Sequence, residues 1–272
     1  MKRWLLLLIG AALIAADAPP YRSSPERRTV VETRDWGPWA GPFRAKLVPS
    51  LMQDFGERYI YAAANAALPA PTTREQRVVF FGDSITDMWD LAHSFPGKPY
   101  VNRGIGAQVS AQMLVRFEAD VVALRPTAVI ILAGTNDVSG MLQIETPETI
   151  LANITAMADI ADARGIRIVL SSLLPVNDYT DNARYMLKDR PPATLRTINT
   201  ALRAFARRRG YGYADYAGAM TDAHGLLQAE LTRDGLHPTS VGYDCMAPIA
   251  SAAITQALRQ RAPTAPAQTS AR

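Results

Sequence analysis

The residues best suited to do chemistry in this 272-residue chain are a serine, an asparagine and an aspartate–histidine pair. Asp234 and His237 stand three positions apart with Gly235 between them, so a single turn can bring carboxylate and imidazole together. A carboxylate on one ring nitrogen fixes the tautomer and leaves the other nitrogen to accept a serine proton. A surface Asp-x-x-His turn without function would show the same spacing, so the pair needs a nucleophile beside it.

Ser84 is the candidate nucleophile, because it closely follows a predicted buried strand. The run VVFF at 78–81 has the β-branched and aromatic content of a strand covered on both faces. Gly82 ends the run, since glycine tolerates the backbone angles of a sharp turn. Ser84 is then expected at the carboxyl edge of a parallel strand, where open α/β sheets place their ligand sites. A helix N-cap is the alternative role for a serine in this position.

Asn136 is the candidate donor for an oxyanion. It follows the apolar run AVIILA at 128–133, and its amide can donate a hydrogen bond. Backbone N–H groups of Ser84 and of the 104–107 loop could supply the other donors. The alternative is a turn-forming asparagine, which is common in Gly-Thr-Asn-Asp sequences.

The elements that must position these residues alternate along the chain. Strand-like runs are separated by segments with helical periodicity, a pattern that predicts a parallel sheet with helices on both faces. The loops that follow the strands then converge on one edge of the sheet, and the candidate residues lie in those loops. The expected strands are 77–81, 99–102, 128–133, 166–171 and 211–214, and the expected helices are 48–67, 109–124, 147–164, 192–209 and about 239–259.

The first 18 residues have the order of a secretory signal peptide. Lys2 and Arg3 precede a continuous apolar run, and small residues follow it. The apolar run is too short for a permanent bilayer span, so no stable membrane anchor is expected after cleavage. Cleavage after Ala18 and cleavage after Ala16 both fit the pattern. The sequence thus predicts a periplasmic or secreted protein.

The charge and the cysteine and histidine counts limit the kinds of partner and cofactor expected for this chain. The net charge of +4 is mild for a chain of this length, so no nucleic-acid partner is expected. Cys245 is the only cysteine, which excludes an internal disulfide and directs stability to the core. Three histidines and one cysteine make a zinc cluster improbable.

The motifs around these residues resemble the four conserved blocks of the SGNH/GDSL hydrolases. They are GDSI with Ser84, RGIGA at 103–107, GTND with Asn136 and DGLHP with His237, in the family's order and spacing over residues 76–255. The resemblance implies a flavodoxin-like three-layer α/β/α sandwich with a five-stranded parallel sheet. It also implies serine ester hydrolysis without metal or cofactor. Ser84 would be the nucleophile, and His237 the general base oriented by Asp234.

The same resemblance implies an oxyanion hole made of the Ser84 N–H, an N–H of the second block and the Asn136 side chain. One position departs from the family pattern, because the donor glycine aligns with Ala107, and Gly106 precedes it. A backbone N–H survives a glycine-to-alanine change. The added methyl group could nevertheless narrow the pocket or forbid a positive φ angle.

The sequence patterns and the resemblance together predict four parts of the chain. Residues 1–18 are the signal peptide, 19–75 an N-terminal arm (irregular over 19–45) and a helix packing on the domain, 76–260 the SGNH hydrolase domain, and 261–272 a disordered tail. The expected function is that of an exported serine esterase acting on a small-molecule or carbohydrate O-acyl ester, an acetylated carbohydrate being one candidate. A lysophospholipase, a short-chain lipase, an acyltransferase and a non-catalytic carbohydrate-binding relative are the alternatives. The oligomeric state is left open.

Residues 174–191 form the longest irregular stretch inside the expected domain, and we predict that this segment shapes the substrate pocket. It leaves the fourth expected strand at the same sheet edge as Ser84. A surface excursion far from the site is the alternative. The residues expected to meet a sugar hydroxyl are Asn177, Asp178 and Tyr179, and those expected to meet an acyl chain are Tyr185, Met186 and Leu187.

Overall fold

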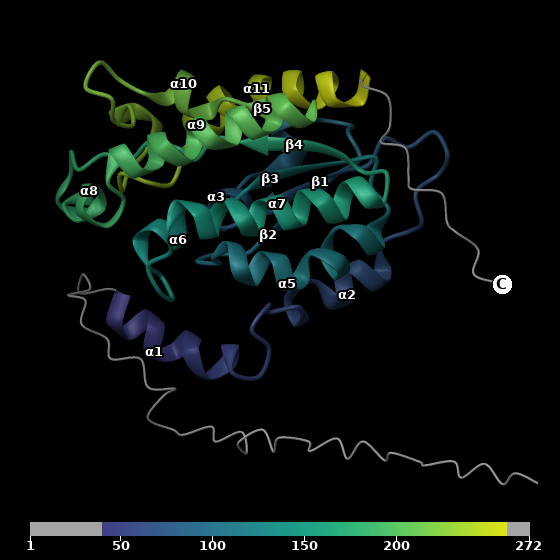
Figure 1. The fold of residues 1–272 in the computed structure, drawn as a ribbon, viewed down its shortest axis with the longest axis horizontal. Helices are drawn as coiled ribbons and strands as arrows, with labels where there is room; N and C mark the ends of the chain where they lie inside the picture. The colour runs from purple at the N-terminus through teal and green to yellow at the C-terminus, as the bar shows by residue number, and fades with distance from the viewer. Residues whose placement is uncertain (1–39, 260–272) are drawn as a thin grey trace, which may run out of the picture. The chain divides into compact units, whose positions relative to one another are not determined.

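The computed structural model describes residues 40–259. The predicted signal peptide, the arm over 19–39 and the tail from 261 lie outside the described residues. Within them, five strands form one all-parallel sheet in the order β2-β1-β3-β4-β5 (Figure 1). This is the predicted flavodoxin-like order. The strands are β1 (Val78–Gly82), β2 (Tyr100–Gly104), β3 (Ala128–Leu132), β4 (Arg167–Ser171) and β5 (Gly212–Ala214), each within two residues of its expected bounds.

Helices cover both faces of the sheet, which gives the three layers. α5 (Ser110–Asp120), α7 (Pro147–Ala163) and α9 (Pro192–Arg209) pack side by side over one face, and α11 (Ser240–Arg259) packs on β3, β4 and β5 (Figure 1). The approach of α11 is close at Gly212, where a Cβ atom would lie 2.8 Å from the Ala253 carbonyl oxygen. No described helix is both long enough and apolar enough to cross a membrane.

The core lies between these layers. Every residue of β1 and of β3 is buried, as expected for strands covered on both faces. On α5 the apolar face includes the fully buried Met113 and Phe117, and the Phe117 ring meets the Phe81 ring edge-on at 5.3 Å. The helix expected over 109–124 ends at Asp120, and a 3-10 turn, η2 (Val122–Leu124), completes the segment.

The prediction of one helix over 48–67 is wrong, because parts of two helices occupy that segment. α1 (Ala40–Leu51) begins inside the segment expected to be irregular, and α2 (Tyr59–Ala67) follows a break. Gly56 packs against α5 at the break, where a Cβ atom would lie 2.8 Å from Cγ1 of Val115. Glu57 then takes a positive φ of 53° that no helix contains.

The strand order reverses direction at β1, which lies between β2 and β3 in the sheet. From β1 the chain passes outward to β2, then returns to place β3 on the other side of β1. Ligand sites of open α/β sheets lie at the carboxyl ends of the strands flanking such a switch point. Short helices and 3-10 turns follow β1, β3, β4 and β5 in the chain: α3 (Ser84–Asp87), α4 (Leu91–Ser94), α6 (Thr135–Ser139), η3 (Asp181–Ala183), α8 (Met186–Asp189), α10 (Tyr216–Met220) and η4 (Ala229–Leu231).

Candidate active site

Ser84 is the first residue of α3, and one residue, Asp83, separates it from the carboxyl end of β1. The helix N-cap is Asp83, whose Oδ1 accepts a hydrogen bond from the Ile85 N–H at 3.0 Å, so Ser84 does not have the capping role. Gly82 is needed for a reason other than the one predicted. Its φ is not positive, but a Cβ atom there would lie 2.1 Å from Thr86 Oγ1. Glycine thus lets α3 turn back tightly over the end of β1.

Ser84, His237 and Asp234 form a hydrogen-bonded line. Ser84 Oγ lies 2.9 Å from His237 Nε2, and His237 Nδ1 lies 2.6 Å from Asp234 Oδ2. Since a carboxylate can only accept, Nδ1 carries the proton and Nε2 is free to take one from the serine hydroxyl. The arrangement has the geometry of a nucleophile, a general base and a group that orients the base.

Asp234 is held in place by its own turn. Its Oδ1 accepts hydrogen bonds from the N–H groups of Leu236 at 3.0 Å and of His237 at 2.8 Å. Gly235 makes the turn possible with a φ of 80°, and a Cβ atom there would lie 2.2 Å from the Asn177 carbonyl oxygen. Burial opposes ionisation of Asp234, but the hydrogen bonds from His237 and Leu236 outweigh it and hold the pKa well below its usual range.

Asn136 lies in the first turn of α6, at the carboxyl end of β3, and is buried. Its Nδ2 donates to the Gln108 carbonyl oxygen at 3.0 Å, which uses one of the two amide hydrogens. Asn136 and Ser84 line one pocket, so the second hydrogen is available to a ligand beside Ser84. The sequence-predicted residues of strands β1 and β3 therefore meet.

The loop after β2 brings Gly106 and Ala107 into the same pocket. Burial raises the pKa of the Asp87 carboxyl, and a hydrogen bond from the Gly106 N–H lowers it, so that N–H is already engaged. Ala107 takes a φ of 66°, in the left-handed region. The expectation that a methyl group could forbid a positive φ at this position is wrong: alanine adopts it, at a cost of about 1–2 kcal/mol.

The pocket that contains these residues has a volume of about 470 Å³, which suits a small-molecule ligand. The side chains around the catalytic candidates are mostly apolar, and the segment 174–191 supplies three lining residues, as predicted.

Two residues of that segment that were expected to contact a sugar hydroxyl bind other parts of the protein. Asn177 is buried and bonds the Leu227 carbonyl, and the Tyr179 hydroxyl bonds Asp222. The lining residues are Phe43, Ser84, Met88, Gly106, Ala107, Asn136, Met141, Asn182, Met186, Arg190, Asp234, Leu236 and His237.

Two charged groups beside the site were not among the predicted functional residues. Asp83 is fully buried, and its Oδ2 has no hydrogen-bond partner among the described residues. Burial raises its pKa to about 6, against the opposing effects of the Ile85 N–H, His237 and Arg190. Arg190 is 2% exposed and donates through Nη2 to Asn136 Oδ1 at 3.3 Å. In the sequence this arginine stands in the polar stretch KDRP, which gives no sign of burial.

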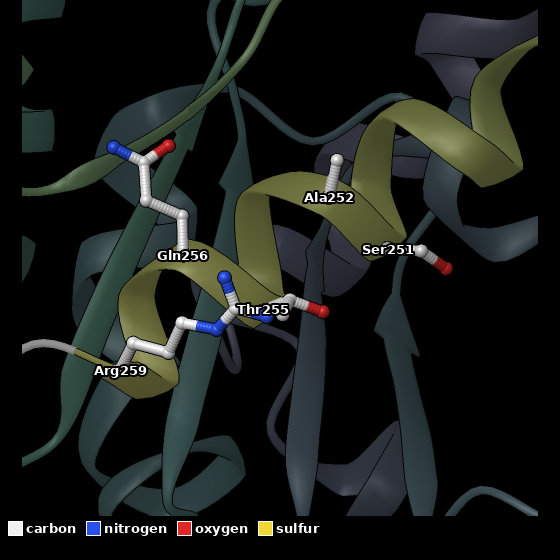
Figure 2. A pocket seen from close by; sticks show the side chains of 5 residues that line it. All are labelled: Ser251, Ala252, Thr255, Gln256 and Arg259. Atoms are coloured by element: carbon white, nitrogen blue, oxygen red, sulfur yellow. The ribbon is translucent and has the colours of Figure 1, made fainter.

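A second hollow of about 590 Å³ lies on α11, away from these residues. Figure 2 shows that all of its labelled side chains come from this one helix. They are Ser251, Ala252, Thr255, Gln256 and Arg259, and no histidine or carboxylate stands beside the serine. The chemistry therefore places the candidate site around Ser84. Within residues 40–259, no cluster of three histidine, cysteine or acidic side chains could hold a metal ion.

Comparison with known proteins agrees with this location. The model of the GDSL-like lipase/acylhydrolase family matches residues 80–245, a range that contains every candidate residue named above except Phe43. Among curated protein sequences no match was found.

Solved structures of similar proteins extend the match over most of the chain. A protein assigned as an acylhydrolase from Bacteroides fragilis is 36% identical, with a TM-score of 0.70, and the match covers 76% of this chain and 99% of that one. A GDSL-like lipase from Bacteroides thetaiotaomicron is 35% identical, with a TM-score of 0.70 and coverages of 75% and 100%. An acetyl-xylooligosaccharide esterase from Geobacillus is 20% identical, with a TM-score of 0.55 and coverages of 66% and 94%, which shows the fold alone.

Proposed function

Because the chain belongs to the GDSL-like lipase/acylhydrolase family, whose members hydrolyse esters, we propose that it is a serine esterase with Ser84, His237 and Asp234 as its catalytic triad. One observation carries the proposal. Ser84 Oγ, His237 and Asp234 are joined by contacts of 2.9 and 2.6 Å inside a pocket of ligand size. A non-catalytic carbohydrate-binding relative would need no such line, and the geometry argues against that alternative.

In the first half of the reaction, Ser84 Oγ attacks the ester carbonyl carbon while its proton passes to His237 Nε2. The carbonyl oxygen becomes a tetrahedral oxyanion. When the intermediate collapses, the bond to the alcohol oxygen breaks and the imidazolium returns the proton to that oxygen. Asp234, ionised and hydrogen-bonded to Nδ1, stabilises the imidazolium without becoming protonated itself.

In the second half, the acyl group is esterified to Ser84. His237 takes a proton from a water molecule, whose oxygen attacks the acyl carbon. Collapse of the second tetrahedral intermediate releases the carboxylic acid and returns the proton to Ser84. An acyltransferase would use a hydroxyl of an acceptor in place of this water.

Three N–H donors are proposed for the oxyanion. The Ser84 N–H lies in the first turn of α3, where helix geometry supplies no internal acceptor. The Ala107 N–H follows Gly106, whose own N–H is engaged by Asp87. The remaining amide hydrogen of Asn136 is the third donor. Donors fixed in this way need no reorganisation when charge develops on the oxygen.

The pocket lining supports an ester with an apolar group. Outside the catalytic set, the larger apolar side chains that line the pocket outnumber the polar ones. They are Phe43, Met88, Met141, Met186 and Leu236. Methionine side chains adapt to ligands of different shape, so the lining fits a short acyl chain or a lipid-like alcohol. This favours a short-chain esterase or lysophospholipase. The acetylated carbohydrate expected from the sequence is supported by the polar Asn182, and by structures that match in fold alone.

We also propose that the protein is exported, since its first 18 residues have the pattern of a signal peptide. The mass of the mature protein recovered from a bacterial periplasm would test this. Loss of the first 16 or 18 residues is the expected result, and an intact N-terminus would contradict the proposal.

A panel of p-nitrophenyl esters from acetate to decanoate tests the function, with acetylated xylan and a lysophospholipid assayed in parallel. Hydrolysis of the short and medium esters is expected, at rates that vary with chain length. Acetate release from xylan faster than turnover of every other ester would make the carbohydrate the better substrate. No ester hydrolysis by a folded protein would contradict the proposal.

A further inference from the structure

The side-chain amide of Asn136 can act as an oxyanion donor in only one of its two orientations. Its NH2 end donates to a negative oxygen, whereas its carbonyl oxygen would repel that charge. The two orientations have nearly the same shape, so packing alone does not choose between them. The choice depends on the groups that contact each end of the amide.

Both contacts of Asn136 specify the same orientation. The Arg190 guanidinium, which can only donate, lies with Nη2 3.3 Å from Asn136 Oδ1. The Gln108 carbonyl oxygen, which can only accept, lies 3.0 Å from Asn136 Nδ2. A rotated amide would set an NH2 group against the guanidinium and an oxygen against a carbonyl oxygen. The amide hydrogen offered to the pocket is therefore fixed.

Arg190 is itself held in place by several contacts, so it can fix the orientation of the Asn136 amide. It is 2% exposed, its Nε donates to Thr135 Oγ1 at 3.1 Å, and its Nη1 lies 3.5 Å from Met186 Sδ. Its guanidinium thus contacts two successive residues of the GTND motif. The main chain is restrained as well, because Arg190 is the C-cap of α8 and Pro191 is the N-cap of α9.

We propose that Arg190 is a positioning residue that stabilises the oxyanion through Asn136. A buried positive charge at Oδ1 polarises the amide and makes its N–H hydrogens stronger donors, in surroundings where water screens little. The benefit appears as negative charge develops on the substrate oxygen. The inference rests on the proposed esterase function and adds to it a residue outside the four sequence motifs.

A double-mutant cycle tests the coupling. Arg190→Met should lower kcat about 10- to 100-fold with KM changed less than about threefold, because the oxyanion forms only in the transition state. In an Asn136→Ala background the same substitution should change kcat by less than about threefold, since the residue it acts through is gone. Equal losses in both backgrounds, or an effect on KM alone, would overturn the assignment.

Controls separate positioning from folding. Arg77 is another buried arginine, at the opposite end of β1, where it bonds the carbonyls of Leu124 and Pro69. Arg77→Met should lower the melting temperature to a similar degree and leave kcat within about twofold. If Arg190→Met does not fold, Arg190→Lys takes its place in the cycle and the same non-additivity is required.

A neutron or atomic-resolution crystal structure of the Arg190 variant, in which the amide nitrogen and oxygen of Asn136 can be told apart, gives a readout independent of ester turnover. The Asn136 amide should rotate away from the Gln108 carbonyl oxygen or occupy two orientations. An amide that stays in place would overturn the inference even where the protein is an active esterase. Absence of ester hydrolysis by the wild-type protein would instead contradict the proposed function.

Discussion

Ser84 Oγ and His237 Nε2 lie 2.9 Å apart although 153 positions separate them in the chain. Parallel strands bring this about: Ser84 follows β1, the strand in contact with both β2 and β3. His237 lies three residues before α11, which packs on β3, β4 and β5. The Tyr243 hydroxyl in α11 donates to the Ile85 carbonyl oxygen at 2.8 Å and ties the two regions together. The contact is thus a property of the whole fold.

Asn136→Ala should lower kcat about 10²- to 10³-fold and change KM little, because the lost donor acts on the transition state. Steady-state kinetics on a p-nitrophenyl ester measure both constants. Asn182→Ala is the matched control, since this asparagine lines the pocket away from the motifs. It should change KM or chain-length preference instead. An Asn136 variant with a KM effect alone would mark that residue as an ordinary substrate contact.

Asp234→Asn should lower kcat about 10³- to 10⁴-fold, because an asparagine can hold the histidine in the wrong tautomer. Asp244→Asn, an exposed change on α11, should leave kcat within about twofold. Activity of the Asp234 variant close to wild type would contradict the triad assignment.

The depressed pKa of Asp234 also predicts how stability depends on pH. Since folding lowers this pKa below the unfolded value of 3.8, ionised Asp234 stabilises the fold above about pH 4, and this contribution is lost as pH falls further. The difference in unfolding free energy between wild type and Asp234→Asn should shrink as pH falls below 4. Urea unfolding measures it, and a difference that grows in acid would contradict the prediction.

Ala107→Gly should keep kcat within about twofold, because the backbone N–H remains. Relief of the left-handed strain at φ 66° is partly offset by the greater freedom of glycine in the unfolded chain, so a stabilisation of about 0–1 kcal/mol is expected. Ala107→Val should destabilise by more than about 1 kcal/mol. A Gly variant with a tenfold loss of kcat would show that the methyl group itself shapes the site.

Asp83→Asn tests the buried carboxyl beside the nucleophile. The pKa of Asp83 rises from 3.8 to about 6 on folding, so its stabilising contribution is present below pH 4 and is lost as pH rises through 6. The shift corresponds to about 3 kcal/mol. The unfolding free energy of wild type should therefore fall by up to that amount between pH 4 and 7, relative to the unfolding free energy of Asp83→Asn. Asp90→Asn is the control, because Asp90 is also a helix N-cap but is exposed. A difference in unfolding free energy between wild type and Asp83→Asn that does not vary with pH would contradict the prediction.

The sequence predicted the parts of the site that strand ends and local spacing define. The runs at 78–81 and 128–133 are apolar throughout because both faces of their strands are covered, and the residues after them had to meet at the sheet edge. Asp234 and His237 were predictable because one glycine turn closes their contact.

Features that depend on distant packing could not be predicted in this way. The break between α1 and α2 arises where Gly56 meets α5, a contact with no local pattern. Arg190 stands among charged residues that are typical of solvent-exposed turns, and its burial depends on Thr135 and Asn136, more than 50 positions earlier. Neither Asn177 nor Tyr179 lines the pocket, because both side chains are hydrogen-bonded to the segment that follows β5.

The central claim, that Ser84 is the nucleophile of an esterase, is tested most directly by ester turnover of Ser84→Ala beside Ser251→Ala, which removes the hydroxyl in the hollow on α11. Both variants should fold, and Ser251→Ala should match wild type. Ser84→Ala should lose about four to six orders of magnitude in kcat. A folded Ser84 variant that keeps more than about 1% of wild-type turnover would contradict the account.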